Sequence, residues 1–171
     1  MSTKNRIKHQ IKSLNNSFVS VGAIKEVNHL GISRIKYSSK NLAIAKKTLP
    51  YKNPFNNVSI AIKRKLFNSI GGYGDTRIGE DWILSGKILK ETNNIYFEDK
   101  VYVLVNIGED FLERRSGAKV YKEIKKSLGI LYDLKIINLH EFLISKAIQK
   151  VSRVYLPKYF LNMIYNLNRK N

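Results

Sequence analysis

The chain of 171 residues has no cysteine, no long apolar run and few acidic residues. The absence of cysteine excludes a disulfide scaffold, a cysteine-ligated zinc site, an iron–sulfur cluster and thiol catalysis. No stretch approaches the roughly 18 apolar residues that a transmembrane helix needs. The start of the chain, up to Ser17, is basic without an apolar core, so it does not resemble a signal peptide. The length and the 43% of hydrophobic residues predict one folded domain with its own core.

Acidic residues are scarce, since 13 Asp and Glu stand against 31 Lys and Arg, for a formal net charge of +18. Residues 1–52 carry a net +10, residues 53–117 are neutral and residues 118–171 carry +8. A nucleic-acid-binding module would gain little from a neutral, carboxylate-rich centre, whereas an active site flanked by basic surfaces would. Lys, Asn and Ile together make up 61 residues, so genome composition alone is a second explanation of the charge.

Hydrophobic periodicity predicts alternating helices and strands, which is the pattern of an α/β fold. Pro54 ends one helical stretch, because the residue before a proline avoids the helical conformation, and Gly71-Gly72 ends another. The expected strands are 18–27, 32–37, 58–62 and 95–105, the last as one strand or two. The expected helices are 4–16, 39–48, 63–69, 82–90 and most of the chain after 117.

Residues 139–155 have an amphipathic pattern at helical spacing, with apolar residues confined to an arc of about 140°. Lys146, Lys150 and Arg153 lie along one edge of this arc. Two interpretations stay open. In one, the arc packs on the core and its basic edge is solvated; in the other, the helix is interfacial and its cations reach anionic lipid headgroups. The apolar residues are Leu143, Ile144, Ala147, Ile148, Val151, Val154 and Tyr155.

Two adjacent carboxylates, Glu80 and Asp81, precede an expected helix in an otherwise basic protein. The dipole and the free N–H groups of a helix N-terminus favour an ionised carboxylate. Such a group is a candidate general base, although a simple N-cap is the commoner role of Asp at this place.

Two adjacent arginines, Arg114 and Arg115, precede the next expected helix and suit a phosphate or pyrophosphate, with a solvated basic turn as the alternative. The sequence has no glycine-rich phosphate loop and no Asp-x-Asp pair. The spacing of His9, His29 and His140 does not suggest a metal site.

Taken in chain order, these motifs resemble the C-terminal half of a family 2 bacterial glycosyltransferase of the GT-A type, of the O-antigen and exopolysaccharide kind. The resemblance covers nearly the whole chain, and its specificity comes from the order of the motifs. Asn53-Pro54-Phe55-Asn56 with Lys63-Arg64 resembles the family's NPFNH…RK stretch, Ile70-Gly71-Gly72-Tyr73 its GGY turn, Glu80-Asp81 its ED motif, and Leu104 to Gly108 with Arg114-Arg115-Ser116-Gly117 its LVxxRxG…RRxG ending. Residues 140–165 resemble its basic, apolar helical tail.

The resemblance implies a partial mixed sheet with helices, in which residues 1–117 form the acceptor-side part of a GT-A domain and residues 118–171 a basic helical tail packed on it. Inverting enzymes of this type transfer a sugar from a nucleotide diphosphate to an acceptor hydroxyl, whose proton a carboxylate must accept. Asp81 matches that base and Glu80 lies beside it. Arg114 and Arg115 would bind phosphate.

Acceptor contacts are implied for Gly71, Gly72, Asn56 and Trp82, with a core position equally open for Trp82. The complete family enzyme is expected to use Mg or Mn, whereas this chain is expected to bind no metal. The implied partners are a nucleotide sugar and a saccharide or lipid-linked acceptor, in the cytoplasm, with a peripheral contact to the inner face of the plasma membrane.

Two positions depart from the family pattern, since Asn57 stands where His is usual and Asn106 where Arg is usual. The family's nucleotide-binding strands and metal-binding carboxylates would precede Met1. We therefore expect a truncated, split or degenerate glycosyltransferase that is inactive alone. The alternative is a non-catalytic basic module that binds nucleic acid or an anionic membrane, with nucleic acid the less expected partner.

Overall fold

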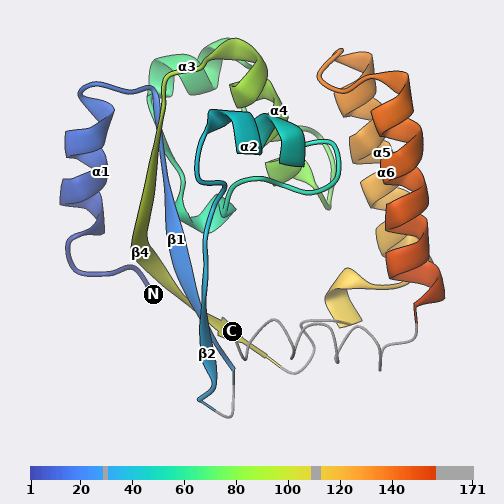
Figure 1. Ribbon diagram of the computed structural model, residues 1–171, viewed down its shortest axis with the longest axis horizontal. Helices are drawn as coiled ribbons and strands as arrows, with labels where there is room; N and C mark the ends of the chain where they lie inside the picture. Colours follow the sequence, from blue (N-terminus) through green and yellow to red (C-terminus); the bar gives the residue numbers. More distant parts are fainter. Residues whose placement is uncertain (29–30, 109–112, 157–171) are drawn as a thin grey trace.

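A computed structural model describes residues 1–28, 31–108 and 113–156 and confirms the α/β class (Figure 1). Its sheet is mixed. The central strand β1 (Val19–Asn28) pairs in parallel with β4 (Ile95–Ile107) along its whole length. On its other side, β1 pairs antiparallel with β3 (Ala61–Ile62) near its start and with β2 (Ser33–Lys36) near its end. His29 and the tail 157–171 lie outside the described residues.

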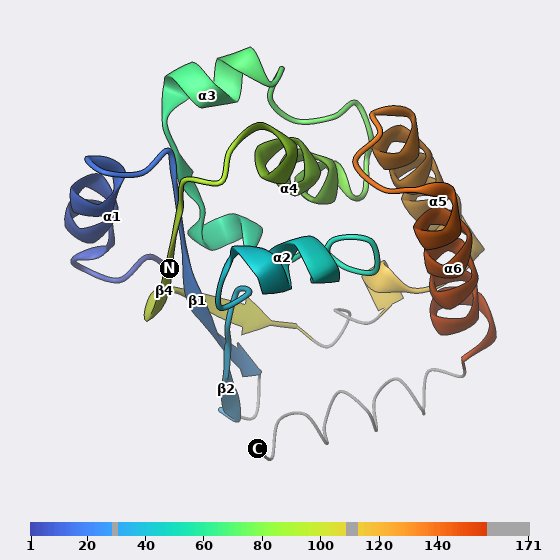
Figure 2. The ribbon, with the colours of Figure 1, turned by 45° about the horizontal axis from the view of Figure 1, so that its top comes forward.

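The helices lie to both sides of this sheet. Helix α1 is at one side, and α5 and α6 run side by side at the opposite end of the molecule (Figures 1 and 2). None of the helices within the described ranges is both long and apolar enough to cross a bilayer. The helices are α1 (Arg6–Leu14), α2 (Leu42–Thr48), α3 (Arg64–Ser69), α4 (Glu80–Glu91), α5 (Ala118–Asp133) and α6 (Leu139–Lys150), with 3-10 turns η1 (Asn57–Ser59) and η3 (Glu113–Arg115) and the π turn η4 (Val151–Tyr155).

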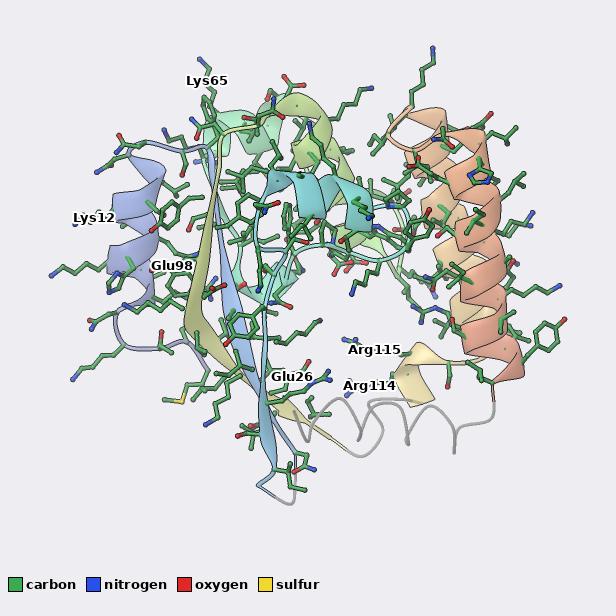
Figure 3. The ribbon with its side chains drawn as sticks, in the orientation of Figure 1. Lys12, Glu26, Lys65, Glu98, Arg114 and Arg115 are labelled. Atoms are coloured by element: carbon green, nitrogen blue, oxygen red, sulfur yellow. The ribbon has the colours of Figure 1, made fainter. Side chains whose placement is uncertain are left out.

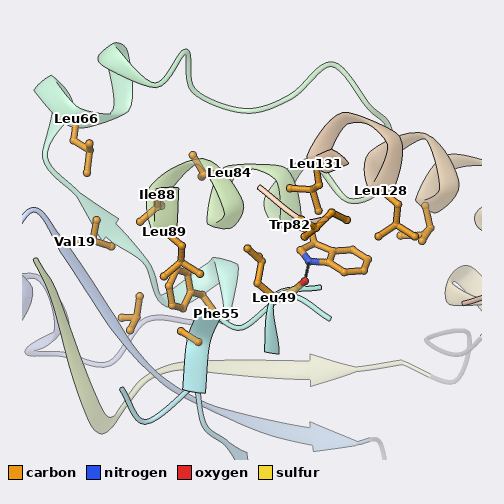
Figure 4. Packing of buried hydrophobic residues seen from close by; sticks show 14 residues of the cluster. Val19, Leu49, Phe55, Leu66, Trp82, Leu84, Ile88, Leu89, Leu128 and Leu131 are labelled. Carbon is orange, nitrogen blue, oxygen red and sulfur yellow. Dashed lines mark hydrogen bonds between the residues drawn. The ribbon is translucent and has the colours of Figure 1, made fainter. Parts of the chain in front are cut away.

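The main hydrophobic core is built around α4. Its side chains pack between β1 and α5, and Figure 4 shows the indole of Trp82 between Leu49 and the leucines of α5. The Trp82 Nε1–H donates to the Leu49 carbonyl at 2.7 Å, so the polar atom of the ring is satisfied inside the core. Leu128 and Leu131 of α5 belong to the same core, and residues 118–156 therefore pack on the preceding part of the chain.

The strand expected over 58–62 is wrong in its first half. Only Ala61–Ile62 pairs with β1, and the preceding residues form η1. The Ser59 hydroxyl donates to the Gly22 carbonyl at 2.7 Å and lies 2.9 Å from the Asn56 carbonyl. These local bonds compete with the ladder and tighten the segment into a turn.

Helix α6 ends at Lys150 and turns its polar side to the protein, so its apolar arc does not pack on the core. Its buried residues are Ser145 and Gln149, whereas Leu143 is 51% and Val151 52% exposed. The Ser145 hydroxyl donates to the Pro50 carbonyl at 2.6 Å, and the Gln149 amide to the Tyr51 carbonyl at 2.9 Å. Hydrogen bonds hold this face of the helix in place, together with the half-buried ring of Phe142, which packs against the core.

Candidate functional site

A cleft of about 1110 Å³ lies between the sheet, the N-terminus of α4 and the turn η3. It brings together segments that are far apart in the sequence. Figure 3 shows Arg114 and Arg115 pointing from η3 toward the side of the sheet that carries Glu26. Of the residues proposed from the sequence, the cleft is lined by Asn56, Glu80, Asp81, Trp82, Arg114 and Arg115.

Asp81 lies in the first turn of α4 and is not its N-cap, so the simple capping role is wrong. The N-cap is Gly79, with a left-handed φ of 89°, and it makes no side-chain cap bond. A Cβ at Gly79 would lie 2.6 Å from the Ser127 hydroxyl of α5, so glycine allows this close approach. Within the described parts of the chain, no hydrogen bond or ion pair engages the Asp81 carboxylate. It lines the cleft and is therefore available to a ligand.

Arg115 is held in place by Arg153, a residue of η4. The Arg153 Nη1 donates to the Arg115 carbonyl at 2.6 Å, and the Gly117 N–H donates to the Arg153 carbonyl at 2.8 Å. The Arg153 Nε donates to the Gln149 side chain at 2.8 Å. Burial, with the nearby charge of Arg115, lowers the pKa of Arg153. This network fixes the main chain at Arg115, which lines the cleft.

Lys36 is a further cation of the cleft, and the charges of both Asp81 and Arg115 affect its pKa. Desolvation lowers its pKa; the charge of Glu26 opposes this shift, Arg115 and Arg34 add to it, and Asp81 also opposes it. The charges of Asp81 and Arg115 thus act in opposite directions on the pKa of one ammonium group, and all three residues line the cleft. Glu26 itself is 4% exposed and accepts the Arg34 Nε at 2.6 Å.

The cleft has more cations than the sequence motifs indicated. Three carboxylates, from Glu26, Glu80 and Asp81, line it. Of the cations in the cleft, the sequence predicts only the arginine pair as site residues. The other cations reach the cleft through tertiary packing. Among them, only Arg153 belongs to a sequence pattern, the basic edge of the amphipathic segment 139–155. An excess of cations favours a ligand with several negative charges. The seven cations are Lys36, Lys40, Lys52, Arg77, Arg114, Arg115 and Arg153.

Asn56 and Trp82 build the wall of the cleft. Asn56 is 4% exposed, and its amide donates to the Lys36 carbonyl at 2.9 Å, which ties β2 to the segment that precedes η1. Trp82 is 4% exposed, and its ring N–H is hydrogen-bonded to the Leu49 carbonyl. Of the two roles that the sequence allows for Trp82, the structure therefore shows the core position.

Gly71 and Gly72 are not among the lining residues of this cleft. Both have left-handed φ values, 70° and 57°, and a Cβ on Gly72 would lie 2.9 Å from the Phe67 ring. The turn after α3 explains why both positions are glycine, because its left-handed backbone favours this residue. In this turn the Lys87 ammonium donates to the Gly72 carbonyl at 3.1 Å. The two departures from the family pattern, Asn57 and Asn106, do line the cleft.

The described residues do not fit a metal site. No group of three or more His, Asp or Glu side chains that could hold an ion occurs in the described ranges. Of the three cleft carboxylates, Glu26 is already paired with Arg34. No family model, curated protein or solved structure matches the chain. The fold and the site define an α/β protein with an open mixed sheet and a predominantly cationic cleft that holds an available carboxylate.

Proposed function

We propose that this cleft is the acceptor side of a glycosyl-transfer site, of the family 2 type that the sequence resembles. The observation that supports this proposal most is that separate sequence motifs meet at one place in the fold. Three separate motifs of that resemblance, around Asn56, Glu80-Asp81 and Arg114-Arg115, line the same cleft. The Gly71-Gly72 turn, a fourth motif of the resemblance, lies outside the cleft, so the proposal rests on the other three.

The chemistry assigned to the chain is a single displacement. An acceptor hydroxyl oxygen forms a bond to the anomeric carbon of the donor sugar, and the bond from that carbon to the nucleotide diphosphate breaks. The hydroxyl proton passes to the Asp81 carboxylate. The leaving diphosphate carries away the bonding electron pair, and Arg114 and Arg115 stabilise its charge. The proposal routes no step through a metal, because the described residues offer no ligand set for one.

The nucleoside part of the donor is assigned to a second polypeptide or segment, because the strands that bind it in the family have no matching motif in this sequence, whereas the diphosphate is assigned to Arg114 and Arg115 of this chain. We therefore expect no sugar transfer by this chain alone. Its partners in the proposal are a nucleotide sugar and a saccharide or lipid-linked acceptor in the cytoplasm.

Titration with uridine diphosphate tests the phosphate side of the proposal. Arg115→Gln is expected to weaken binding on the order of tenfold, since a charge-assisted contact contributes roughly 1.5–3 kcal/mol. Arg64→Gln is the matched control, because Arg64 is an exposed arginine of α3 outside the cleft. Asp81→Asn removes a negative charge from the same cleft and is expected to strengthen binding. Equal weakening by both arginine variants would contradict the proposal.

Transfer itself is tested with the nucleotide-binding half of a family 2 enzyme supplied as a second chain. Asp81→Asn is expected to lower kcat by roughly 10²–10⁴-fold, because the carboxamide cannot accept the proton. Asp133→Asn, an exposed position at the end of α5, is the control and should leave kcat unchanged.

The excess of cations in the cleft also favours a second candidate, an anion-binding module without catalysis. This candidate predicts that single-stranded RNA competes with uridine diphosphate, with a steep dependence on salt. Such competition, together with a complete absence of transfer in the two-chain assay, would favour it over glycosyl transfer.

A further inference from the structure

The outer face of α6 and η4 is apolar although no described residue covers it. Six of its large apolar side chains are at least one-third exposed, and Figures 1 and 2 place α6 at the outer edge of the molecule. We call this surface the outer α6 face. Its exposed fractions are 54% for Leu139, 51% for Leu143, 46% for Ile148, 52% for Val151, 38% for Val154 and 63% for Tyr155.

This exposure is unusual because polar side chains, which usually face solvent, lie on the buried side of the helix instead. Ser145 and Gln149 are buried there, and hydrogen bonds attach them to the carbonyls of Pro50 and Tyr51. An isolated exposed apolar side chain needs no explanation, but six of them along α6 and η4 indicate a surface that contacts something else.

The charges around the stripe indicate what that contact is. Residues 118–156 carry eight Lys or Arg against three Asp or Glu. The Lys146 ammonium lies 5.8 Å from the centre of the Phe142 ring, and the Lys150 ammonium lies 5.6 Å from that of Tyr155. Each ammonium group thus lies over an aromatic ring, as in a cation–π contact. The contact of Lys150 places a cation beside Tyr155, an aromatic side chain of the outer α6 face.

We propose that the outer α6 face lies on an anionic lipid surface, with its apolar side chains among the acyl chains near the headgroups and the lysines at the phosphates. An apolar arc beside a cationic edge is the pattern of a helix that lies in the membrane interface. A second copy of the chain fits less well, because two such faces would bring an excess of positive charge from both sides together. The proposal does not depend on the chemistry of the cleft.

Vesicle flotation of the full chain tests the proposal, with phosphatidylcholine vesicles that contain or lack phosphatidylglycerol. Ile148→Gln is expected to weaken binding to the anionic vesicles on the order of tenfold, because an amide replaces an apolar side chain that inserts into the lipid. Lys150→Gln should weaken it about fivefold. Ile35→Gln is the matched control, since Ile35 on β2 is 47% exposed against 46% for Ile148.

Three results would overturn the proposal. Equal loss of binding in Ile148→Gln and Ile35→Gln would mean that the +18 charge alone attracts the chain to the vesicles. A dimer in the absence of lipid that Ile148→Gln dissociates would assign the face to a second copy. A lower unfolding midpoint in Ile148→Gln, without any change in flotation, would mean that the chain's own residues cover the face.

Discussion

Helices α4 and α6 have the same length, 12 residues, and opposite relations to the protein. Helix α4 buries seven residues, five of them apolar, whereas the only buried residues of α6 are Ser145 and Gln149. The first helix is held by apolar packing, whereas the second is held by hydrogen bonds to backbone carbonyls and by one half-buried ring, Phe142, that packs against the core. The contrast teaches that periodicity locates an apolar face without saying whether the core or another surface receives it.

The largest difference is expected for isoleucine truncations on the two helices. Ile88→Ala on α4 should lower the free energy of unfolding by about 2–5 kcal/mol, because it leaves a cavity at a position with 0% exposure. Ile148→Ala on α6 should change it by no more than about 0.5 kcal/mol. Urea denaturation of both variants measures the pair, and comparable losses would show that α6 is packed like α4.

A smaller effect is expected where α6 is attached. Ser145→Ala leaves the buried Pro50 carbonyl without its donor, so it should cost about 1–2 kcal/mol of unfolding free energy. Ser152→Ala is the control, because its hydroxyl contacts only the Gln149 carbonyl of the same helical segment, at 3.3 Å. Thermal unfolding compares the two, and an equal shift of both midpoints would contradict the anchoring role of Ser145.

Several parts of the fold could be predicted because they depend on local sequence. The strand β1 and the helices α1 to α4 have periodicity and end signals within their own residues. The π turn after α6 and the division of 57–62 into a turn and a short strand could not be predicted, because contacts to distant segments, such as Gly22 for Ser59 and Arg115 for Arg153, decide them.

The candidate site divides in the same way. The order of motifs led to Asp81 and Arg115, which share the cleft, and also to Gly71-Gly72, which lie at a turn outside it. Lys36 and Arg153 were missed because only the folded chain brings β2 and η4 to η3.

The smallest effect is expected at Lys36, in the cleft. Desolvation lowers the pKa of Lys36 in the folded chain, so below that pKa the protonated group disfavours folding relative to its free state. Lys36→Gln should therefore stabilise the chain at neutral pH, by less than about 0.5 kcal/mol because solvent screens the charge. The gain should fade as the pH rises through the lowered pKa toward the usual lysine range, and pH-dependent urea titrations measure this. A gain that instead grows with pH would contradict the assignment.

Hydrogen exchange measured segment by segment tests most directly whether the cleft and the outer α6 face are two separate functional surfaces. With uridine diphosphate, slower exchange is predicted in residues 79–83 and 114–118, and none in residues 143–155. With phosphatidylglycerol vesicles, the reverse pattern is predicted. Protection of the same segment by both ligands, or no protection of the cleft segments by uridine diphosphate, would contradict the account.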